Sequence, residues 1–481
     1  MWLGLDIGTS GVKAVLVDEA GAIVAQATAP LALKRPHPLW SEQSPEDWWL
    51  ATRTAVAALP PELRAAVRGV GVSGQMHGAV LLDRWDGVLR PAILWNDGRA
   101  HAECVALAAA EPRSRAITGN LAMPGFTAPK LLWVREHEPK VFGRIAKVLL
   151  PKDYVRLRMT GDHASDMSDS AGTLWLDVAA RRWSDEMLAA CGLTEQHMPR
   201  LHEGSEPTGT LLSGAAAALG LPRVPVAAGG GDNAAGAVGA GVTAPGDAFL
   251  SLGTSGVVFA VSDGFMPNTA QAVHAFCHAL PDRWHQMAVI LSAAACIDWA
   301  ARLGGFADVP VALAAAEAST ADAVPIFLPY LSGERTPHND PHAKGVLFGL
   351  THDTDPGALV RGVLEGVAFA LADGTDALRS AGTRIDALSV VGGGSRSPFW
   401  GGILAAALGA RLEYRAGADV GPALGAAILA RLAVTGEPPE AMCTPGPLQH
   451  AIEPDPMIAK AMAARRSRFR SLYPALKDQF A

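Results

Sequence analysis

The pentapeptide Gly-Thr-Ser-Gly-Val occurs twice, at residues 8–12 and again at residues 253–257. The offset between the two copies is 245 residues, close to half of the 481-residue chain. In each copy a short apolar run precedes the first glycine and another follows the last one, which predicts a strand, a tight turn and a second strand. The repeat therefore predicts two like-folded halves, each presenting a hairpin loop to one shared ligand.

Helical patterns and further apolar strands follow each predicted hairpin. Examples are a helix over 45–58 and strands over 68–72, 224–228 and 389–391. Alternation of this kind indicates the α/β class with mixed sheets. A joint with proline and glycine at 242–247 (VTAPGD) predicts the boundary between an N-terminal domain of residues 1–242 and a C-terminal domain of residues 243–481.

The composition excludes several classes of protein. Hydrophobic residues make up 49% of the chain and charged residues 18%, against about 25% charged in an average globular domain, so a disordered protein is excluded. With 40 basic and 47 acidic residues, the charge gives no reason to expect a nucleic-acid partner. The arginine cluster at 465–470 is predicted to be a solvated helix face.

The cysteines and the N-terminus bear on the compartment. The five cysteines have no C-x-x-C spacing, and such a sparse set predicts reduced, buried thiols, as in a cytosol. The N-terminus has no basic segment of the kind that begins a signal peptide. No apolar window is long enough to predict a membrane span. We therefore expect a cytoplasmic protein without a membrane partner.

Three glycine-rich loops, each after an apolar strand, are candidates for binding phosphate. Their residues are Gly8, Thr9 and Ser10; Gly253, Thr254 and Ser255; and Gly392, Gly393 and Gly394. Glycine lets the backbone approach a phosphate closely, and successive N–H groups form an anion-binding concavity. A plain turn would be favoured for any single loop. Three loops, two of them identical, favour phosphate binding.

Two charged residues flank the first loop. Asp6 precedes it and can hold Mg²⁺ on the far side of a phosphate, directly or through water. Lys13 follows it, either to add positive charge or as a solvated strand lysine. Other nucleotide motifs do not fit, because no Gly-Lys dipeptide is present for a P-loop. The G-x-G-x-x-G match at 69–74 does not open a predicted helix.

Asp232 is the candidate general base. It follows the triple glycine 229–231 and precedes a helix of small residues. The position suits an N-cap and also a base that takes a proton from a substrate hydroxyl, and the two roles are compatible. His77 lies at a strand end, where a structural histidine is the more common case. Trp95 begins a polar turn that suits a polyhydroxyl ligand or an internal ion pair.

Segments spread over nearly the whole chain match those of one known family. They include LDIGTSGVKAVLVD (5–18), PHPLWSEQ (36–43), GQMHGA (74–79), RPAILWNDGR (90–99), LLPKDYVRLRMTG (149–161), SDMSDSAGTLWLDV (165–178), GGGDNAAGAVGAG (229–241), SLGTSGV (251–257), FLPYLSGERTPHN (327–339) and DVGPALGAA (419–427). In these segments the chain resembles the FGGY carbohydrate kinases, and most closely those members that phosphorylate D-xylulose.

This resemblance implies a fold, a reaction and residue roles. The implied fold is two actin-like ATPase (ribonuclease H-like) domains with an active-site cleft between them. The implied reaction is ATP-dependent phosphorylation of D-xylulose at O5, with Mg²⁺ near Asp6, the sugar and ATP as partners, and a homodimer. The two hairpins would clamp the phosphates and the third loop the adenosine. Asp232 would be the base, and Met76, His77, Asp232 and Asn233 would line the sugar site. Trp95 joins this set of candidates because of its polar turn.

Two alternatives stay open at this point. The first is the same reaction on another polyol, such as ribulose, fuculose, gluconate or glycerol, since these kinases share the ATP loops. The second is an actin-like or Hsp70-like ATPase, which shares the loops but works as a filament or a chaperone. Such a protein needs polymer contacts or a peptide-binding domain, and no segment of the sequence indicates either.

Overall fold

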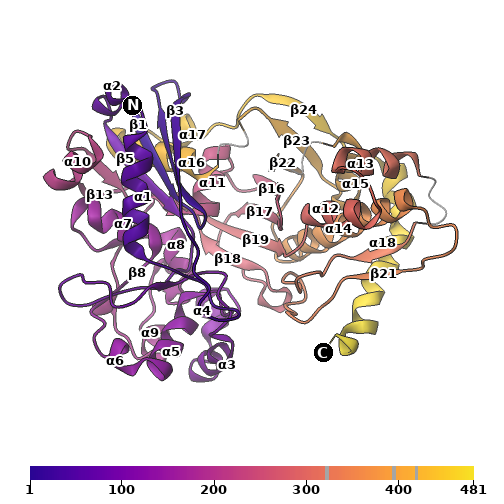
Figure 1. Ribbon diagram of the computed structural model, residues 1–481, viewed down its shortest axis with the longest axis horizontal. Coiled ribbons are helices and arrows are strands. Elements are labelled where there is room, and N and C mark those ends of the chain that lie inside the picture. Colours follow the sequence, from indigo (N-terminus) through magenta and orange to yellow (C-terminus); the bar gives the residue numbers. More distant parts are fainter. Residues whose placement is uncertain (320–323, 393–396, 418–420, 481) are drawn as a thin grey trace.

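The structure is a computed structural model that describes residues 1–319, 324–392, 397–417 and 421–480. It has two lobes placed side by side along its long axis, each built around a seven-stranded mixed sheet with helices against it (Figure 1). The prediction of a two-domain α/β fold is confirmed.

The first sheet has the order β13-β14-β5-β1-β2-β3. Its strands are β1 (Trp2–Ile7), β2 (Gly11–Val17), β3 (Ile23–Pro30), β5 (Gly69–Gly74), β13 (Pro207–Thr210) and β14 (Pro225–Ala227), with β15 (Gly230–Gly231) paired to β5. β1, β2 and β3 are antiparallel, β5 and β14 run parallel to β1, and β13 is antiparallel to β14.

The second sheet repeats this plan. Its strands are β16 (Ala248–Leu252), β17 (Gly256–Ser262), β18 (His274–Cys277), β19 (Trp284–Ile290), β22 (Ala387–Val391), β23 (Arg411–Arg415) and β24 (Leu448–Ile452), in the order β18-β19-β17-β16-β22-β23-β24. β16, β17 and β19 are antiparallel, β22 and β23 run parallel to β16, and β24 is antiparallel to β23. The two Gly-Thr-Ser-Gly-Val copies hold the same place in both sheets, at the turn between the first two strands, as the repeat predicts.

Helices and small strand pairs complete the two lobes. In the first half the helices are α1 (Pro45–Ala57), α2 (Pro61–Ala65), α3 (His101–Ala110), α4 (Ser114–Thr118), α5 (Thr127–His137), α6 (Pro139–Phe142), α7 (Pro151–Thr160), α8 (Met167–Ala171), α9 (Asp185–Ala190), α10 (Ser213–Leu219) and α11 (Asp232–Ala240). In the second half they are α12 (Ala295–Leu303), α13 (Val309–Ala318), α14 (Pro356–Ser380), α15 (Pro398–Leu408), α16 (Pro422–Thr435), α17 (Pro439–Met442) and α18 (Pro456–Leu476). The small pairs are β4 (Glu42–Gln43) with β7 (Ala92–Ile93), β6 (Val80–Leu82) with β8 (Lys147–Leu149), β9 (Ala164–Asp166) with β12 (Arg200–His202), β10 (Leu176–Asp177) with β11 (Arg182–Trp183), and β20 (Ile326–Leu328) with β21 (Val346–Phe348).

Two helices cross between the sheets (Figure 1). α16 follows the second sheet's strands in sequence but packs on β1 and β5 of the first sheet. α11 belongs to the first half, yet its Ala237 shares a buried cluster with Phe249 and Phe259 of the second sheet. The helices touch at glycines, because a Cβ on Gly425 would lie 1.7 Å from the carbonyl oxygen of Ala235. The boundary placed between residues 242 and 243 stays a prediction, and the α16 contact shows that the lobes are interleaved.

The C-terminal arginine cluster differs from its prediction. Arg466 and Arg470 form ion pairs with Asp373 and Asp376 of α14, and Arg465 pairs with Glu365. The interpretation as a solvated face is therefore wrong for Arg465 and Arg466, which are partly buried against acidic residues of α14, whereas Arg468 and Arg470 are exposed as predicted.

The cysteine prediction is confirmed in part: all five cysteines are buried free thiols. Within the described residues, no helix has both the length and the apolar character that a membrane span requires.

Candidate functional site

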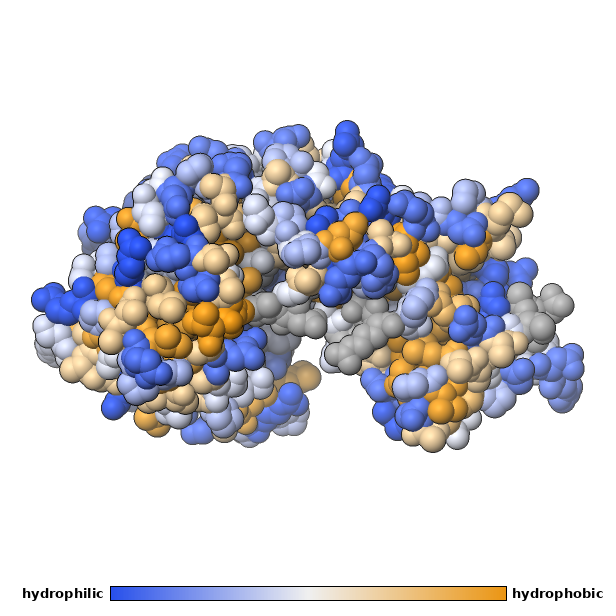
Figure 2. Space-filling view, turned by 90° about the horizontal axis from the view of Figure 1, so that it is seen from above, coloured by the Kyte–Doolittle hydropathy of each residue, from blue (hydrophilic) through white to orange (hydrophobic). Residues whose placement is uncertain are grey.

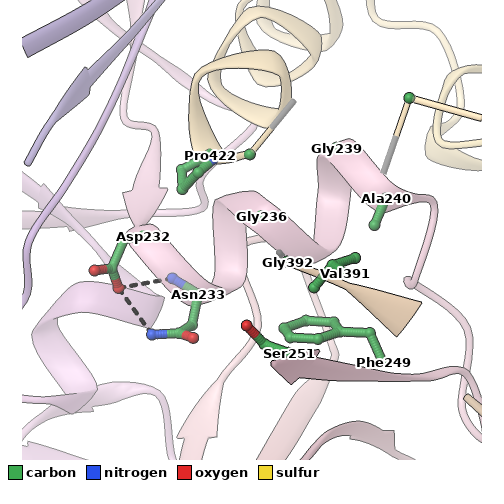
Figure 3. A pocket seen from close by; sticks show the side chains of 12 residues that line it. Asp232, Asn233, Gly236, Gly239, Ala240, Phe249, Ser251, Val391, Gly392 and Pro422 are labelled. Carbon is green, nitrogen blue, oxygen red and sulfur yellow. Dashed lines mark hydrogen bonds between the residues drawn. The ribbon is translucent and has the colours of Figure 1, made fainter. Parts of the chain in front are cut away.

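A cavity of about 320 Å³ joins the two lobes beside the crossing helices (Figure 3). Asp232 and Asn233 lie at one end of it, and Val391 and Gly392 line it farther along α11. In space-filling view the lobes are separated by an open notch along one side of the molecule (Figure 2). The cavity thus places the candidate base in the same space as the first residue of the third glycine loop. Gly393 and Gly394 lie outside the described residues.

Asp232 is the first residue of α11, and Gly231 is the N-cap. Its Oδ1 accepts hydrogen bonds from the backbone N–H of Asn233 at 2.7 Å and from the Asn233 amide at 2.9 Å (Figure 3). The predicted N-cap role is therefore wrong, because the carboxylate bonds to the next residue and not to the second or third helical N–H. Burial raises the pKa of Asp232 to about 6, against the opposing effect of the Asn233 bonds. A carboxylate with this pKa suits general base catalysis near neutral pH.

Asp6 lies near the end of β1, opposite Lys13 of β2. Burial first, and then the charge of Asp232, raise the pKa of Asp6 to about 7, while Lys13 lowers it. The Oδ1 atom is buried and has no hydrogen-bond partner among the described residues. The repeat places Ser251 at the equivalent position of the second half. The two hairpins therefore differ in one respect that matters for a cation, since only the first carries an acid.

The Asp6 carboxylate fits a Mg²⁺ ligand. A buried carboxylate oxygen without a hydrogen-bond partner and a raised pKa are expected where a bound cation would compensate the negative charge. The described residues contain no cluster of three or more side chains that could hold a metal. Mg²⁺ is commonly bound by one or two carboxylates together with substrate phosphates and water. The residues present therefore fit Mg²⁺ that is held jointly with a nucleotide.

The two hairpin loops leave amide donors at their tips. The Gly8 N–H bonds to the Gly11 carbonyl at 3.0 Å, and the Gly253 N–H bonds to the Ser255 carbonyl at 3.1 Å. In the described structure no hydrogen bond uses the amides of residues 9, 10, 254 and 255. These four donors and the adjacent hydroxyls are the groups that can meet an anion.

Thr9, at the tip of the first loop, is held by three side chains. Its hydroxyl donates to Gln75 Oε1 at 2.8 Å and accepts from the Trp95 indole N–H at 3.0 Å. Gln43 donates to the Thr9 carbonyl at 2.7 Å. Trp95, expected at the sugar site, thus bonds directly to the phosphate-loop candidate. The sequence interpretation missed Gln43 and Gln75, although Gln43 ends the segment PHPLWSEQ and Gln75 is the second residue of GQMHGA.

Met76 lies beside Gly231, the residue before Asp232, and His77 lies beside Gly172. A Cβ on Gly231, the residue before Asp232, would lie 3.0 Å from Met76 Cγ. His77 Nδ1 faces the Gly172 carbonyl at 2.6 Å, so Nδ1 carries the proton and Nε2 is an acceptor. Burial, and after it the charges of Lys130 and Arg335, lower the pKa of His77 to about 3, so the ring is neutral. His77 therefore offers one acceptor nitrogen.

Two basic residues near His77 were not assigned to the site from the sequence. The buried Lys130 donates to the carbonyls of His77 at 2.8 Å and of Gly125 at 2.7 Å, and so fixes the backbone of the QMHG turn. Arg335 belongs to the second half, and one guanidinium nitrogen lies 3.5 Å from His274 Nε2. Its signal was the segment GERTPH, which places two charges shortly after the apolar run 326–331.

A second cavity of about 690 Å³ opens next to the Gly253–Thr254 loop. Most of its lining is apolar and comes from α12, α13 and Trp400, including Ile297, Val309 and Leu313. Ligand pockets with apolar walls and a few polar groups suit flat organic rings. A nucleobase in this cavity would place its phosphates near Thr254.

Comparison with known proteins identifies the family. The N-terminal domain of the FGGY family of carbohydrate kinases matches residues 1–239, and the C-terminal domain of the same family matches residues 248–434.

Relatives and solved structures agree along the whole chain. The xylulose kinase of Escherichia coli (strain K12) is 58% identical over 99% of both chains. The xylulose kinase of Bacillus subtilis (strain 168) is 38% identical over 89% of this chain and 87% of its own. The crystal structure of a "xyloylose kinase" from Brucella ovis superposes with a TM-score of 0.95 at 52% identity, over 99% of both chains. A Plasmodium falciparum glycerol kinase with ADP, at 19% identity and a TM-score of 0.87, shares the fold. The chain belongs to the FGGY family of carbohydrate kinases.

Proposed function

We propose that this protein transfers the γ-phosphoryl group of ATP to the O5 hydroxyl of D-xylulose, giving D-xylulose 5-phosphate, with Asp232 as the general base. Xylulose kinases that match over nearly the full chain support the substrate. The single observation that carries the assignment of the base is the cavity that contains both Asp232 and Gly392, because it lets a sugar hydroxyl and a nucleotide meet.

In this mechanism the protein positions the reactants and balances charge, since phosphoryl transfer has a loose transition state. Asn233 holds Oδ1 of Asp232, which leaves Oδ2 to orient the O5 hydroxyl and take its proton as O5 attacks phosphorus. The bond from phosphorus to the β,γ-bridging oxygen breaks, and ADP leaves.

The sugar is held by neutral groups. His77 Nε2 accepts a hydrogen bond from a sugar hydroxyl, because Nδ1 is already bonded to Gly172. Met76 supplies an apolar contact next to Asp232. Trp95 closes the site toward the first phosphate loop. A site that hydrogen-bonds a particular hydroxyl discriminates strongly against sugars that lack it or turn it away.

The phosphates are held by the hairpin tips. The amides and hydroxyls of Thr9, Ser10, Thr254 and Ser255 stabilise the transferring phosphoryl group, and Lys13 adds positive charge beside Asp6. Gly392–Gly394 contact the adenosine, and the apolar cavity beside Thr254 accepts its adenine ring. Mg²⁺ held by Asp6 would neutralise charge on the β- and γ-phosphates.

The substrate is tested by ADP release over a panel of ketoses and polyols. D-Xylulose is expected to give the highest kcat/KM. A higher kcat/KM for ribulose, fuculose, gluconate or glycerol would contradict D-xylulose as the substrate and identify that compound instead. ADP release that is independent of any sugar would favour an ATPase.

Asp6→Asn is expected to raise the Mg²⁺ concentration for half-maximal activity by about tenfold or more, because the variant loses an anionic ligand. The measurement is a Mg²⁺ titration at saturating ATP and sugar. Asp18→Asn is the matched control, since Asp18 accepts turn hydrogen bonds at the other end of β2. An unchanged Mg²⁺ dependence in Asp6→Asn would remove Asp6 from the metal site.

The dependence of kcat on pH should show the titration of Asp232. With the pKa of Asp232 raised to about 6 by burial, kcat is expected to fall about tenfold per pH unit below that value and to level off above it, because only the ionised carboxylate takes a proton. The measurement is kcat from pH 5 to 9 at saturating Mg²⁺, ATP and sugar. A plateau that continues down to pH 5 would contradict the assignment.

The homodimer implied by the family resemblance and the cytoplasmic location stay predictions. Sedimentation at two protein concentrations tests the first, and fractionation of cells tests the second.

A further inference from the structure

The short helix α8 bonds to both halves of the sugar site. Near its beginning, the Ser168 hydroxyl accepts the backbone N–H of Gly231 at 3.1 Å, and Gly231 immediately precedes Asp232. Just after its end, the Gly172 carbonyl accepts the proton of His77 Nδ1 at 2.6 Å. The helix α8 and its C-cap Gly172 together therefore contact both the backbone next to Asp232 and the side chain of His77.

Ser168 is hydrogen-bonded to one member of a buried ion pair. Its hydroxyl donates to Asp166, whose carboxylate also caps α8 by accepting the Ser168 N–H at 2.7 Å. The other Asp166 oxygen lies 2.7 Å from Lys152 Nζ, in the first turn of α7. Lys152 also lies 2.6 Å from Asp153. At most 1% of each of the three charged side chains is exposed. The chain of contacts runs from Lys152 through Asp166 and Ser168 to the Gly231 peptide.

The cluster pairs basic side chains with acidic ones. Lys152 and Arg156 are its bases, and Asp153, Asp166 and Asp169 are its acids. Burial raises the pKa of Asp169 well above its usual range, and Asp166, Asp153 and Asp232 add to this, although Lys152 opposes them. Breaking a buried ion pair by removing one partner is costly, because it leaves the other partner uncompensated in a low dielectric.

Asp232 needs such support, because among the described residues its carboxylate has hydrogen bonds to Asn233 alone. Gly231 and Gly230 precede it, and glycines by themselves restrict the backbone least. Gly231 pairs with Gly74 at the edge of β5, and the Ser168 bond is the side-chain contact that pins its N–H. A reacting group displaced by about 1 Å can cost about 10²-fold in rate.

We propose that Ser168 is a positioning residue for phosphoryl transfer: through the Gly231 peptide it sets the place of Asp232 relative to His77, and Lys152 and Asp166 hold it there. The inference rests on the proposed role of Asp232 as the base.

The test compares Ser168→Ala with Ser170→Ala. Both serines lie on α8, both are fully buried, and both changes remove one hydroxyl, but the Ser170 hydroxyl bonds to Ser165 and not to Gly231. Ser168→Ala is expected to lower kcat about 10- to 100-fold with KM for ATP unchanged, because the loops of the second lobe are untouched. Ser170→Ala is expected to keep kcat near that of the parent enzyme. Ser168→Cys, which retains the volume but accepts hydrogen bonds weakly, replaces the alanine variant if that variant does not fold.

A double-mutant cycle separates positioning from general destabilisation. In an Asp232→Asn background, Ser168→Ala should cost no further activity, because residues that act through one group are not additive. Equal losses in the two alanine variants, or a loss that adds fully to that of Asp232→Asn, would overturn the inference while leaving Asp232 as the base. An active Asp232→Asn enzyme would overturn both assignments.

Discussion

Asp232→Asn is expected to lower kcat for xylulose phosphorylation by about 10²–10⁴, the usual cost of losing a general base. The asparagine oxygen can still accept both hydrogen bonds that Asn233 donates to Oδ1. The side chain therefore keeps its place, and what it loses is the capacity to take the proton of O5. The measurement is steady-state kinetics at pH 8, with KM for ATP expected to stay close to that of the parent enzyme.

The same variant supplies its own control for folding. The pKa of Asp232 is raised from 3.8 to about 6 by burial, so ionising it in the folded state costs free energy. The protonated form of Asp232 therefore contributes to the stability of the folded state. This contribution is fully present below pH 3.8 and is lost as pH rises through about 6. At pH 8 the parent enzyme lacks this stability, and Asp232→Asn should unfold at a higher temperature than the parent, with the difference disappearing near pH 4. Near-normal turnover in a folded variant would take Asp232 out of the base role.

The fold was predictable because its main feature is repeated in the sequence. Two identical turns, each between apolar runs, fix two hairpins at equal places. Six strands of each sheet then have the same order and directions, and β15 and β18 are the strands in which the sheets differ. The position of α16 was not predictable in this way. Its small, apolar residues are equally compatible with either sheet, and only the close approach of Gly4 and Gly71 to its backbone shows which one it covers.

The site was predictable where its chemistry is local. Asp6 stands out as an acid inside an apolar run just before the glycine loop, and Asp232 as an acid that directly follows three glycines. The N-cap was predicted at Asp232 but lies one residue earlier, at Gly231, because no sequence pattern specifies the exact first residue of α11. Trp95, Lys130, Ser168 and Arg335 act through partners 53 to 86 residues away. Their residue types suggest hydrogen bonding, but only the folded chain determines the partner.

The crossing of α11 and α16 links the fold to the chemistry. α11 begins with Asp232, and α16 begins at Pro422, in the same cavity. The two helices touch at backbone atoms. A change in their separation would therefore move Asp232 relative to Pro422, which lines the same cavity.

Gly425→Ala is accordingly expected to impair both stability and turnover. A Cβ at Gly425 would lie 1.7 Å from the Ala235 carbonyl oxygen and 3.0 Å from the Gly239 nitrogen. These are backbone atoms and cannot rotate aside, so the helices must separate. Overpacking of this kind costs about 1–3 kcal/mol or more, and kcat should fall at least about tenfold as Asp232 shifts. The measurements are the free energy of unfolding in urea and steady-state kinetics on the same preparation.

Gly402→Ala is the matched control for this change. Gly402 lies inside α15 with no atom within 4 Å of the added Cβ, so the same substitution should raise the free energy of unfolding by about 0.5–1 kcal/mol through helix propensity and leave kcat unchanged. Equal urea midpoints for Gly425→Ala and the parent enzyme would mean that the two helices can part without cost. A destabilised Gly425→Ala enzyme with undiminished kcat would mean that their contact holds the lobes together but does not place the base. The expected loss of both properties, against a gain of stability alone in Gly402→Ala, ties the position of Asp232 to the contact between the two halves of the chain.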